Sequence, residues 1–190
     1  MMKNLTAANQ LTILRVLLIP AFVILLLYGY RGWALVTFFT AGATDMLDGL
    51  IARATGQKTE LGAWLDPMAD KLLLVTMFIV LTLPDIGSAN QLPLWFTILV
   101  ISRDVAIVAT VAVFNLAVGP RTFRPSIFGK IATATYILTG VITLYFNYLE
   151  QRSPWVTAFI YASLAITVVS AAHYLVRVIR LTNSSEPTAS

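Results

Sequence analysis

Four aspartates on two neighbouring apolar segments are the residues best suited to chemistry in this chain. Asp45 and Asp48 are three residues apart, and Asp66 and Asp70 are four residues apart. On a helix, residues at either spacing lie on the same face. A short connection joins the two segments, so we expect the two helix faces to meet at one end of the pair. The sequence therefore predicts one site with four carboxylates.

Such a site needs cations, because four anions in a low-dielectric environment repel one another and take up protons unless they are countered. Arg53 and Lys71 cannot balance all four. Oxygen ligands without His or Cys suit hard ions such as magnesium, manganese or calcium rather than zinc. We expect two such ions, because four carboxylates can bridge a pair about 3.5–4 Å apart, the arrangement used for in-line displacement at phosphorus.

The alternative is that these aspartates only cap helices or pair with Arg53 and Lys71. A cap requires one residue at a helix end, whereas here each helix face carries two aspartates. The pattern therefore favours a metal site.

The elements that position the carboxylates are expected to be transmembrane helices. Hydrophobic residues make up 58% of the 190 positions and charged residues 12%, whereas soluble domains are about 25% charged. Six apolar runs approach the roughly 20 residues that span a bilayer. They cover residues 11–29, 33–52, 64–83, 93–115, 128–147 and 155–177. We predict an all-α bundle of six transmembrane helices in one domain, residues 1–182, followed by a disordered polar tail, residues 183–190.

Charge indicates how this bundle is oriented. Six spans place both termini on one side, and most basic residues fall on that side: Lys3, Arg53, Lys58, Arg121, Arg124, Lys130, Arg177 and Arg180. By the positive-inside rule this side is cytoplasmic, so we expect a multi-pass protein of the cell inner membrane with a cytoplasmic active site. The net charge of +4 then reflects orientation and contact with anionic membrane lipids, and no nucleic-acid partner is expected.

The spacing of residues around the aspartates resembles the signature of the CDP-alcohol phosphatidyltransferases. Eight positions within 26 residues match it without a gap: Asp45, Asp48, Gly49, Ala52, Arg53, Gly62, Asp66 and Asp70. The six-span pattern fits the same family over nearly the whole chain. The resemblance implies transfer of a phosphatidyl group from CDP-diacylglycerol to an alcohol, with release of CMP.

The resemblance also implies roles for individual residues. The four aspartates would hold two metal ions, and Asp70 would accept the proton of the attacking alcohol. Gly49, Arg53 and Thr59 would contact the CDP group. These roles are physically reasonable, because glycine leaves room for a nucleotide near the backbone and arginine offers a planar set of donors to phosphate oxygens.

Two acceptor alcohols remain open. Residues 65–71 and 9–12, followed by Arg15, are similar to the phosphatidylglycerophosphate synthases, whose acceptor is glycerol 3-phosphate. Residues 101–105 and 129–130 are similar to the cardiolipin synthases of this fold, whose acceptor is phosphatidylglycerol. Both acceptors carry a phosphate, for which Arg103, Arg121 and Lys130 are candidate ligands. We expect glycerol 3-phosphate, with phosphatidylglycerol as the alternative.

Several of these residues have simpler interpretations. Arg103 and Asp104 would neutralise each other if they served only packing, and Lys130 would equally serve as an interfacial anchor. His173, the single histidine, is expected to pack near the end of the last span.

Two further possibilities concern the molecule as a whole. Small residues such as Gly42 and Ala43 would allow close helix packing or a homodimer. A small cation transporter is the alternative of a different class, but a transport path should place polar groups on both sides of the membrane. The outer half offers only Asp85 and Glu150 in turns, so an enzyme is the better interpretation.

Overall fold

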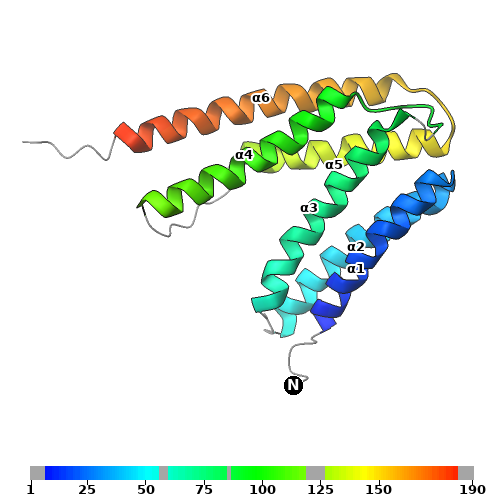
Figure 1. Cartoon of the computed structure of the whole chain (residues 1–190), viewed down its shortest axis with the longest axis horizontal. Helices are drawn as coiled ribbons and strands as arrows, with labels where there is room; N and C mark the ends of the chain where they lie inside the picture. The colour runs from blue at the N-terminus through cyan, green and yellow to red at the C-terminus, as the bar shows by residue number, and fades with distance from the viewer. Residues whose placement is uncertain (1–6, 56–59, 85–86, 119–126, 184–190) are drawn as a thin grey trace, which may run out of the picture. The chain divides into compact units, whose positions relative to one another are not determined.

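The computed structural model describes residues 7–55, 60–84, 87–118 and 127–183, and it describes side chains at 10–48, 68–84, 87–110 and 127–173. This part of the chain is all-helical (Figure 1). The helices are α1 (Ala7–Leu27), α2 (Arg31–Thr55), α3 (Glu60–Thr82), α4 (Leu94–Val118), α5 (Ile127–Tyr148) and α6 (Pro154–Asn183).

One helix accounts for each predicted span, so the all-α prediction is confirmed for the described residues. Among the described residues, three helical segments are long and apolar enough to cross a membrane: Gln10–Leu27, Ile127–Tyr148 and Pro154–His173. The described residues of α2, α3 and α4 contribute none of these three segments. Asn183, predicted to begin the polar tail, is the last residue of α6, and residues 184–190 lie outside the described part.

The chain divides into two compact units. The first comprises Met1–Thr97 and Thr143–Arg152, and the second comprises Ile98–Ile142 and Ser153–Ser190. Each unit is described separately below. All four aspartates predicted to form the site belong to the first unit.

Among the described residues of the first unit, helix α1 packs along α2 and also against α3, whereas α2 and α3 have fewer contacts with each other (Figure 1). Its buried positions recur every three or four residues: Thr12, Arg15, Ile19, Phe22 and Leu26. This spacing gives one continuous helix face. The buried face of α1 thus contains an arginine and a threonine, while exposed positions such as Leu17 and Ile24 are apolar.

A tight turn brings α2 back alongside α1. Gly29 adopts φ of 80°, a left-handed conformation that glycine reaches without the steric penalty of a Cβ atom. The Gly29 amide donates to the Leu26 carbonyl at 3.1 Å, and the Tyr30 amide donates to the Leu25 carbonyl at 2.8 Å. On α2 the small buried residues Ala34 and Ala41 then allow close approach, whereas Gly42 and Ala43 are exposed.

Polar contacts fasten the loops at the end of this unit where that turn lies. The Oδ1 atom of buried Asn147 accepts hydrogen bonds from the backbone amide of Asn90 at 2.7 Å and from its Nδ2 at 3.1 Å. The Nδ2 of Asn147 donates to the Asn90 carbonyl at 3.0 Å. Nearby, Arg31 pairs with Glu150 at 2.6 Å and donates to the Gly87 carbonyl at 2.7 Å. These contacts join the start of α2, the segment after α3 and the end of α5.

The second unit has hydroxyl groups inside and apolar side chains outside. The hydroxyls of Tyr136 on α5 and Thr167 on α6 form a hydrogen bond, and those of Thr139 and Ser163 lie 2.8 Å apart. All four residues are buried. Large apolar side chains on the same two helices are exposed, namely Ile137, Leu138, Tyr161, Val168 and Val169. Interhelical hydroxyl contacts beneath an apolar surface are typical of helices that pack in lipid.

We predict that Asn147→Ala lowers the free energy of unfolding by about 1–3 kcal/mol, because it leaves the polar groups of Asn90 buried without these partners. Thermal or denaturant unfolding of the purified protein in detergent measures the change. The neighbouring variant Gln151→Ala is the control, since the Gln151 side chain is exposed and its carbonyl still accepts from Asn90. It should change stability by no more than about 0.5 kcal/mol. Equal stability of the two variants would contradict the prediction.

Candidate active site

Three of the four predicted aspartates converge on the guanidinium of Arg15. The Nη1 atom of Arg15 lies 2.7 Å from Asp70 Oδ1 and 3.1 Å from Asp45 Oδ1. The Nη2 atom donates a hydrogen bond to Asp48 Oδ2. Asp45 and Asp48 come from α2 and Asp70 from α3, so one α1 side chain connects α1, α2 and α3. The predicted convergence of Asp45, Asp48 and Asp70 is confirmed.

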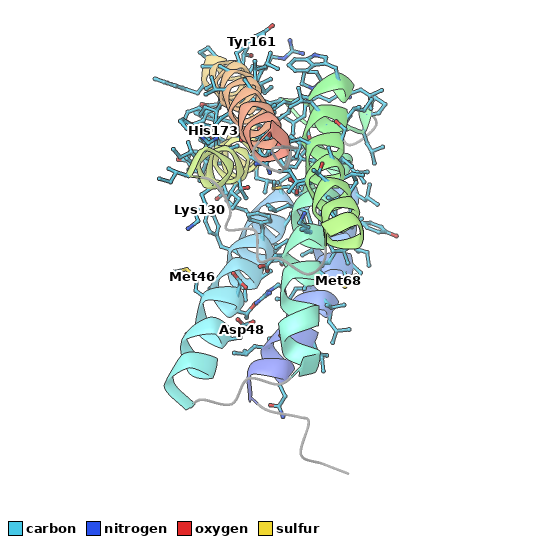
Figure 2. All side chains as sticks on the ribbon, turned by 90° about the vertical axis from the view of Figure 1, so that its left-hand side faces the viewer. Met46, Asp48, Met68, Lys130, Tyr161 and His173 are labelled. Atoms are coloured by element: carbon cyan, nitrogen blue, oxygen red, sulfur yellow. The ribbon has the colours of Figure 1, made fainter. Side chains whose placement is uncertain are left out.

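Burial divides the three carboxylates into two kinds. The side chains of Arg15 and Asp48 are 0% and 3% exposed, whereas those of Asp45 and Asp70 are 41% and 42% exposed. Figure 2 shows Asp48 on the inner side of α2, while Met46 points away from the helix group. The site thus has a closed side at Arg15 and Asp48, and an accessible side formed by Asp45 and Asp70.

Arg15 is the residue of this cluster that the sequence did not predict. In the sequence it belongs to a pattern similar to one branch of the family, while Arg53 and Lys71 are the candidate counter-ions. A signal was present, because Arg15 is the only charged residue in the apolar run of residues 11–29. An ionisable residue within a span is costly and calls for a partner of opposite charge. That partner is the aspartate cluster.

The carboxylates retain an excess of negative charge that suits a divalent cation. One guanidinium faces three carboxylates, which leaves two negative charges unbalanced among these four side chains. The donors are all oxygens, and Asp45 and Asp70 present accessible edges, as a hard cation requires. Among the side chains that the structure describes, no three acidic, histidine or cysteine residues are arranged around a common metal position. The chemistry of the donors fits a metal, while Arg15 holds them in the arrangement seen here.

The structure does not describe every predicted site residue. The side chains of Gly49, Arg53 and Asp66 fall outside the described residues, although their backbones belong to α2 and α3. Thr59 and Arg121 lie outside the described part altogether. The roles of these five residues therefore stay predictions.

The candidate acceptor residues belong to the second unit. Arg103 pairs with Asp104 at 2.8 Å, donates to the Gly129 carbonyl at 3.2 Å and lies 6.0 Å from the ring centroid of Tyr136. The Arg103–Asp104 pair expected from a packing role is thus present. Lys130 is exposed on the first turn of α5.

His173 also lies in the second unit, on α6. Its ring centroid is 4.9 Å from that of Phe128, in agreement with the packing role expected for it. Figure 2 marks both Lys130 and His173.

Comparison with known proteins identifies the family. A model of the CDP-alcohol phosphatidyltransferases matches residues 5–171, which include α1 to α5, most of α6 and the aspartate cluster. The chain belongs to the CDP-alcohol phosphatidyltransferase family. The expectation of a membrane-lipid transferase, drawn from the aspartate spacing, is thereby confirmed.

Three relatives show which enzymes of this family the chain is similar to. The CDP-diacylglycerol–glycerol-3-phosphate 3-phosphatidyltransferase of Haemophilus influenzae is 34% identical over 87% of this chain and 89% of its own length. A Mycobacterium tuberculosis protein named "probable phosphatidylglycerophosphate synthase" is 34% identical over 96% of this chain and 86% of its own length. The CMP-forming cardiolipin synthase of Homo sapiens is 32% identical over 77% of this chain and 53% of its own length.

Because the carboxylates differ in burial, neutralising each one should change the free energy of unfolding by a different amount. Asp48→Asn should lower stability by about 1–3 kcal/mol in the absence of divalent metal, since it weakens a fully buried ionic hydrogen bond. Asp45→Asn should change stability by less than about 1 kcal/mol, because Asp45 is partly solvated and its removal also relieves repulsion from Asp70. Unfolding in detergent with EDTA measures both. The prediction is wrong if Asp45→Asn proves the more damaging change.

Proposed function

We propose that this protein transfers the phosphatidyl group of CDP-diacylglycerol to glycerol 3-phosphate, forming phosphatidylglycerophosphate and CMP. The observation that carries the proposal is the convergence of Asp45, Asp48 and Asp70 in a chain that belongs to this family. Enzymes that transfer a diphosphate-linked group with divalent cations need several oxygen ligands close together. The carboxylate cluster supplies them.

The choice of glycerol 3-phosphate is supported by the extent of the similarity. The two relatives named for phosphatidylglycerophosphate synthesis match this chain over 86–89% of their own lengths. The human cardiolipin synthase matches over 53% of its length. Phosphatidylglycerol remains the second candidate acceptor, because the human relative is 32% identical over the part it shares.

In the proposed reaction the chain's own residues bind, orient and accept a proton. Asp45, Asp48, Asp66 and Asp70 would hold two magnesium or manganese ions, and bound divalent cations at such a site supply charge neutralisation for the diphosphate and acidify the alcohol. Gly49, Arg53 and Thr59 orient the CDP group. Asp70 accepts the alcohol proton as the new oxygen–phosphorus bond forms, and the bond to CMP breaks with its electron pair leaving on CMP.

The same proposal places the protein in the membrane. All six helices span the cell inner membrane, and both termini and the carboxylates face the cytoplasm. The positive-inside distribution of Lys and Arg supports this orientation. The apolar, exposed surfaces of α1, α5 and α6 support contact with lipid. Asp45 and Asp70 would then be accessible to a soluble acceptor while the diacylglycerol chains of the donor remain in the bilayer.

Release of CMP by the purified protein tests the proposal. The reaction contains CDP-diacylglycerol and magnesium, with glycerol 3-phosphate in one set and phosphatidylglycerol in the other. We expect turnover with glycerol 3-phosphate that stops when EDTA removes the metal. Turnover with phosphatidylglycerol alone would instead identify a cardiolipin synthase, and EDTA-resistant turnover would contradict the proposed metal site.

A second test concerns the proton acceptor. Asp70→Asn should lower kcat by about 100- to 10,000-fold, the range typical for loss of a general base. Glu150→Gln is the matched control, since it neutralises a carboxylate that pairs with Arg31 in the loops away from the cluster. Glu150→Gln should retain near-normal turnover. An Asp70→Asn variant with near-normal kcat would remove Asp70 from the proposed mechanism.

A further inference from the structure

Arg15 holds the same carboxylates that would bind metal under the proposed function, and this inference rests on that function. Each contact uses one oxygen: Oδ1 of Asp45, Oδ2 of Asp48 and Oδ1 of Asp70. A divalent cation attracts the same oxygens and carries twice the charge of a guanidinium. Arg15 and a metal at this site therefore act on the same negative charge.

We propose that Arg15 is the counter-ion that keeps the three carboxylates assembled before metal binds, and that metal binding takes over its contacts with Asp45 and Asp70. Arg15 is thus a positioning residue that opposes metal binding. It lowers the affinity of the free enzyme for divalent cations while preserving the geometry that receives them.

The contacts differ in a way that determines which are exchanged. Asp45 and Asp70 share the single Nη1 atom, and their side chains are 41% and 42% exposed. Asp48 has Nη2 as a separate donor and is 3% exposed. A cation arriving from solvent meets Asp45 and Asp70 first, and these two carboxylates compete for one nitrogen. The Nη1 contacts are the ones to be released, while the buried pair with Asp48 keeps Arg15 in place.

The guanidinium of Arg15 also has one N–H group without a hydrogen-bond acceptor among the described residues. Its Nε atom is buried and has no hydrogen-bond partner within the described part of the molecule. A buried donor without a partner disfavours the arrangement that contains it. The Nε atom therefore adds no hydrogen bond to the described contacts of Arg15, and once Asp45 and Asp70 turn to a metal, the pair with Asp48 is the described ion pair that remains.

A purely structural role for Arg15 predicts the opposite metal affinity. If Arg15 only fastened α2 and α3 to α1, its loss would scatter the carboxylates and weaken metal binding. If Arg15 opposes the metal, its neutralisation strengthens binding in the protein that remains folded. The direction of the change in affinity separates the two roles.

The experiment measures Mn²⁺ binding to the full chain in lipid nanodiscs without substrate, by electron paramagnetic resonance or calorimetry. Arg15→Gln should lower the Kd for Mn²⁺ by about tenfold or more, because it removes a positive charge within a few ångströms of the ligands. Arg15→Lys should fall between wild type and Arg15→Gln, since a compact ammonium keeps the charge but cannot bridge three carboxylates. Arg31→Gln is the control for loss of an ion-paired arginine elsewhere in the first unit, and its Kd should equal that of wild type.

The outcomes distinguish this inference from the proposed function. Suppose that wild type binds Mn²⁺ and that the folded Arg15→Gln variant has the same or a higher Kd. That result overturns the proposed role of Arg15 but leaves the proposed metal site intact. If Arg15→Gln does not fold, Arg15→Lys decides, and a Kd equal to or above that of wild type overturns the role. Absence of both Mn²⁺ binding and CMP release in wild type overturns the proposed function together with the inference.

Discussion

The first unit depends on the attraction between one buried guanidinium and three carboxylates. Among the described residues, helices α2 and α3 have fewer contacts with each other than with α1, so their aspartates come together through α1, which packs against both. Removing Arg15 would leave the three carboxylates without their shared cation, and the penalty would be largest at Asp48, which is buried in a region of low dielectric. The predicted site carboxylates and the packing of α1, α2 and α3 therefore share one interaction.

Much of this molecule follows from its sequence, for identifiable reasons. Long apolar runs predict the six helices, because a span of about 20 apolar residues has few alternatives. The spacings between Asp45 and Asp48 and between Asp66 and Asp70 predict shared helix faces, because helical periodicity is fixed. Spacing within a segment carries no information about which third helix lies opposite. For that reason the partnership of Arg15 with Asp45, Asp48 and Asp70 required the packed structure.

The two units use polar groups differently beneath similar apolar surfaces. In the first unit the buried pair of Arg15 and Asp48 is charged and lies beside the carboxylates of Asp45 and Asp70, an arrangement that suits a cation. In the second unit the hydroxyl pairs, Tyr136 with Thr167 and Thr139 with Ser163, are neutral and satisfy one another. Such neutral contacts hold α5 against α6 without creating a demand for a cation. Buried polarity thus marks a candidate site in one unit and a helix interface in the other.

The fastening of the loops by Arg31, Asn90 and Asn147 has a mechanical consequence for the first unit. These contacts join the start of α2, the segment after α3 and the end of α5 near the turn that follows α1. The aspartates lie toward the opposite ends of α2 and α3. When helices are held at one end, a change in their tilt moves the other end most. A small change of tilt at the anchored loops would therefore displace the carboxylates more than the loops. At that end the contacts of Arg15 with the three carboxylates hold α2 and α3 against α1, so they oppose this displacement.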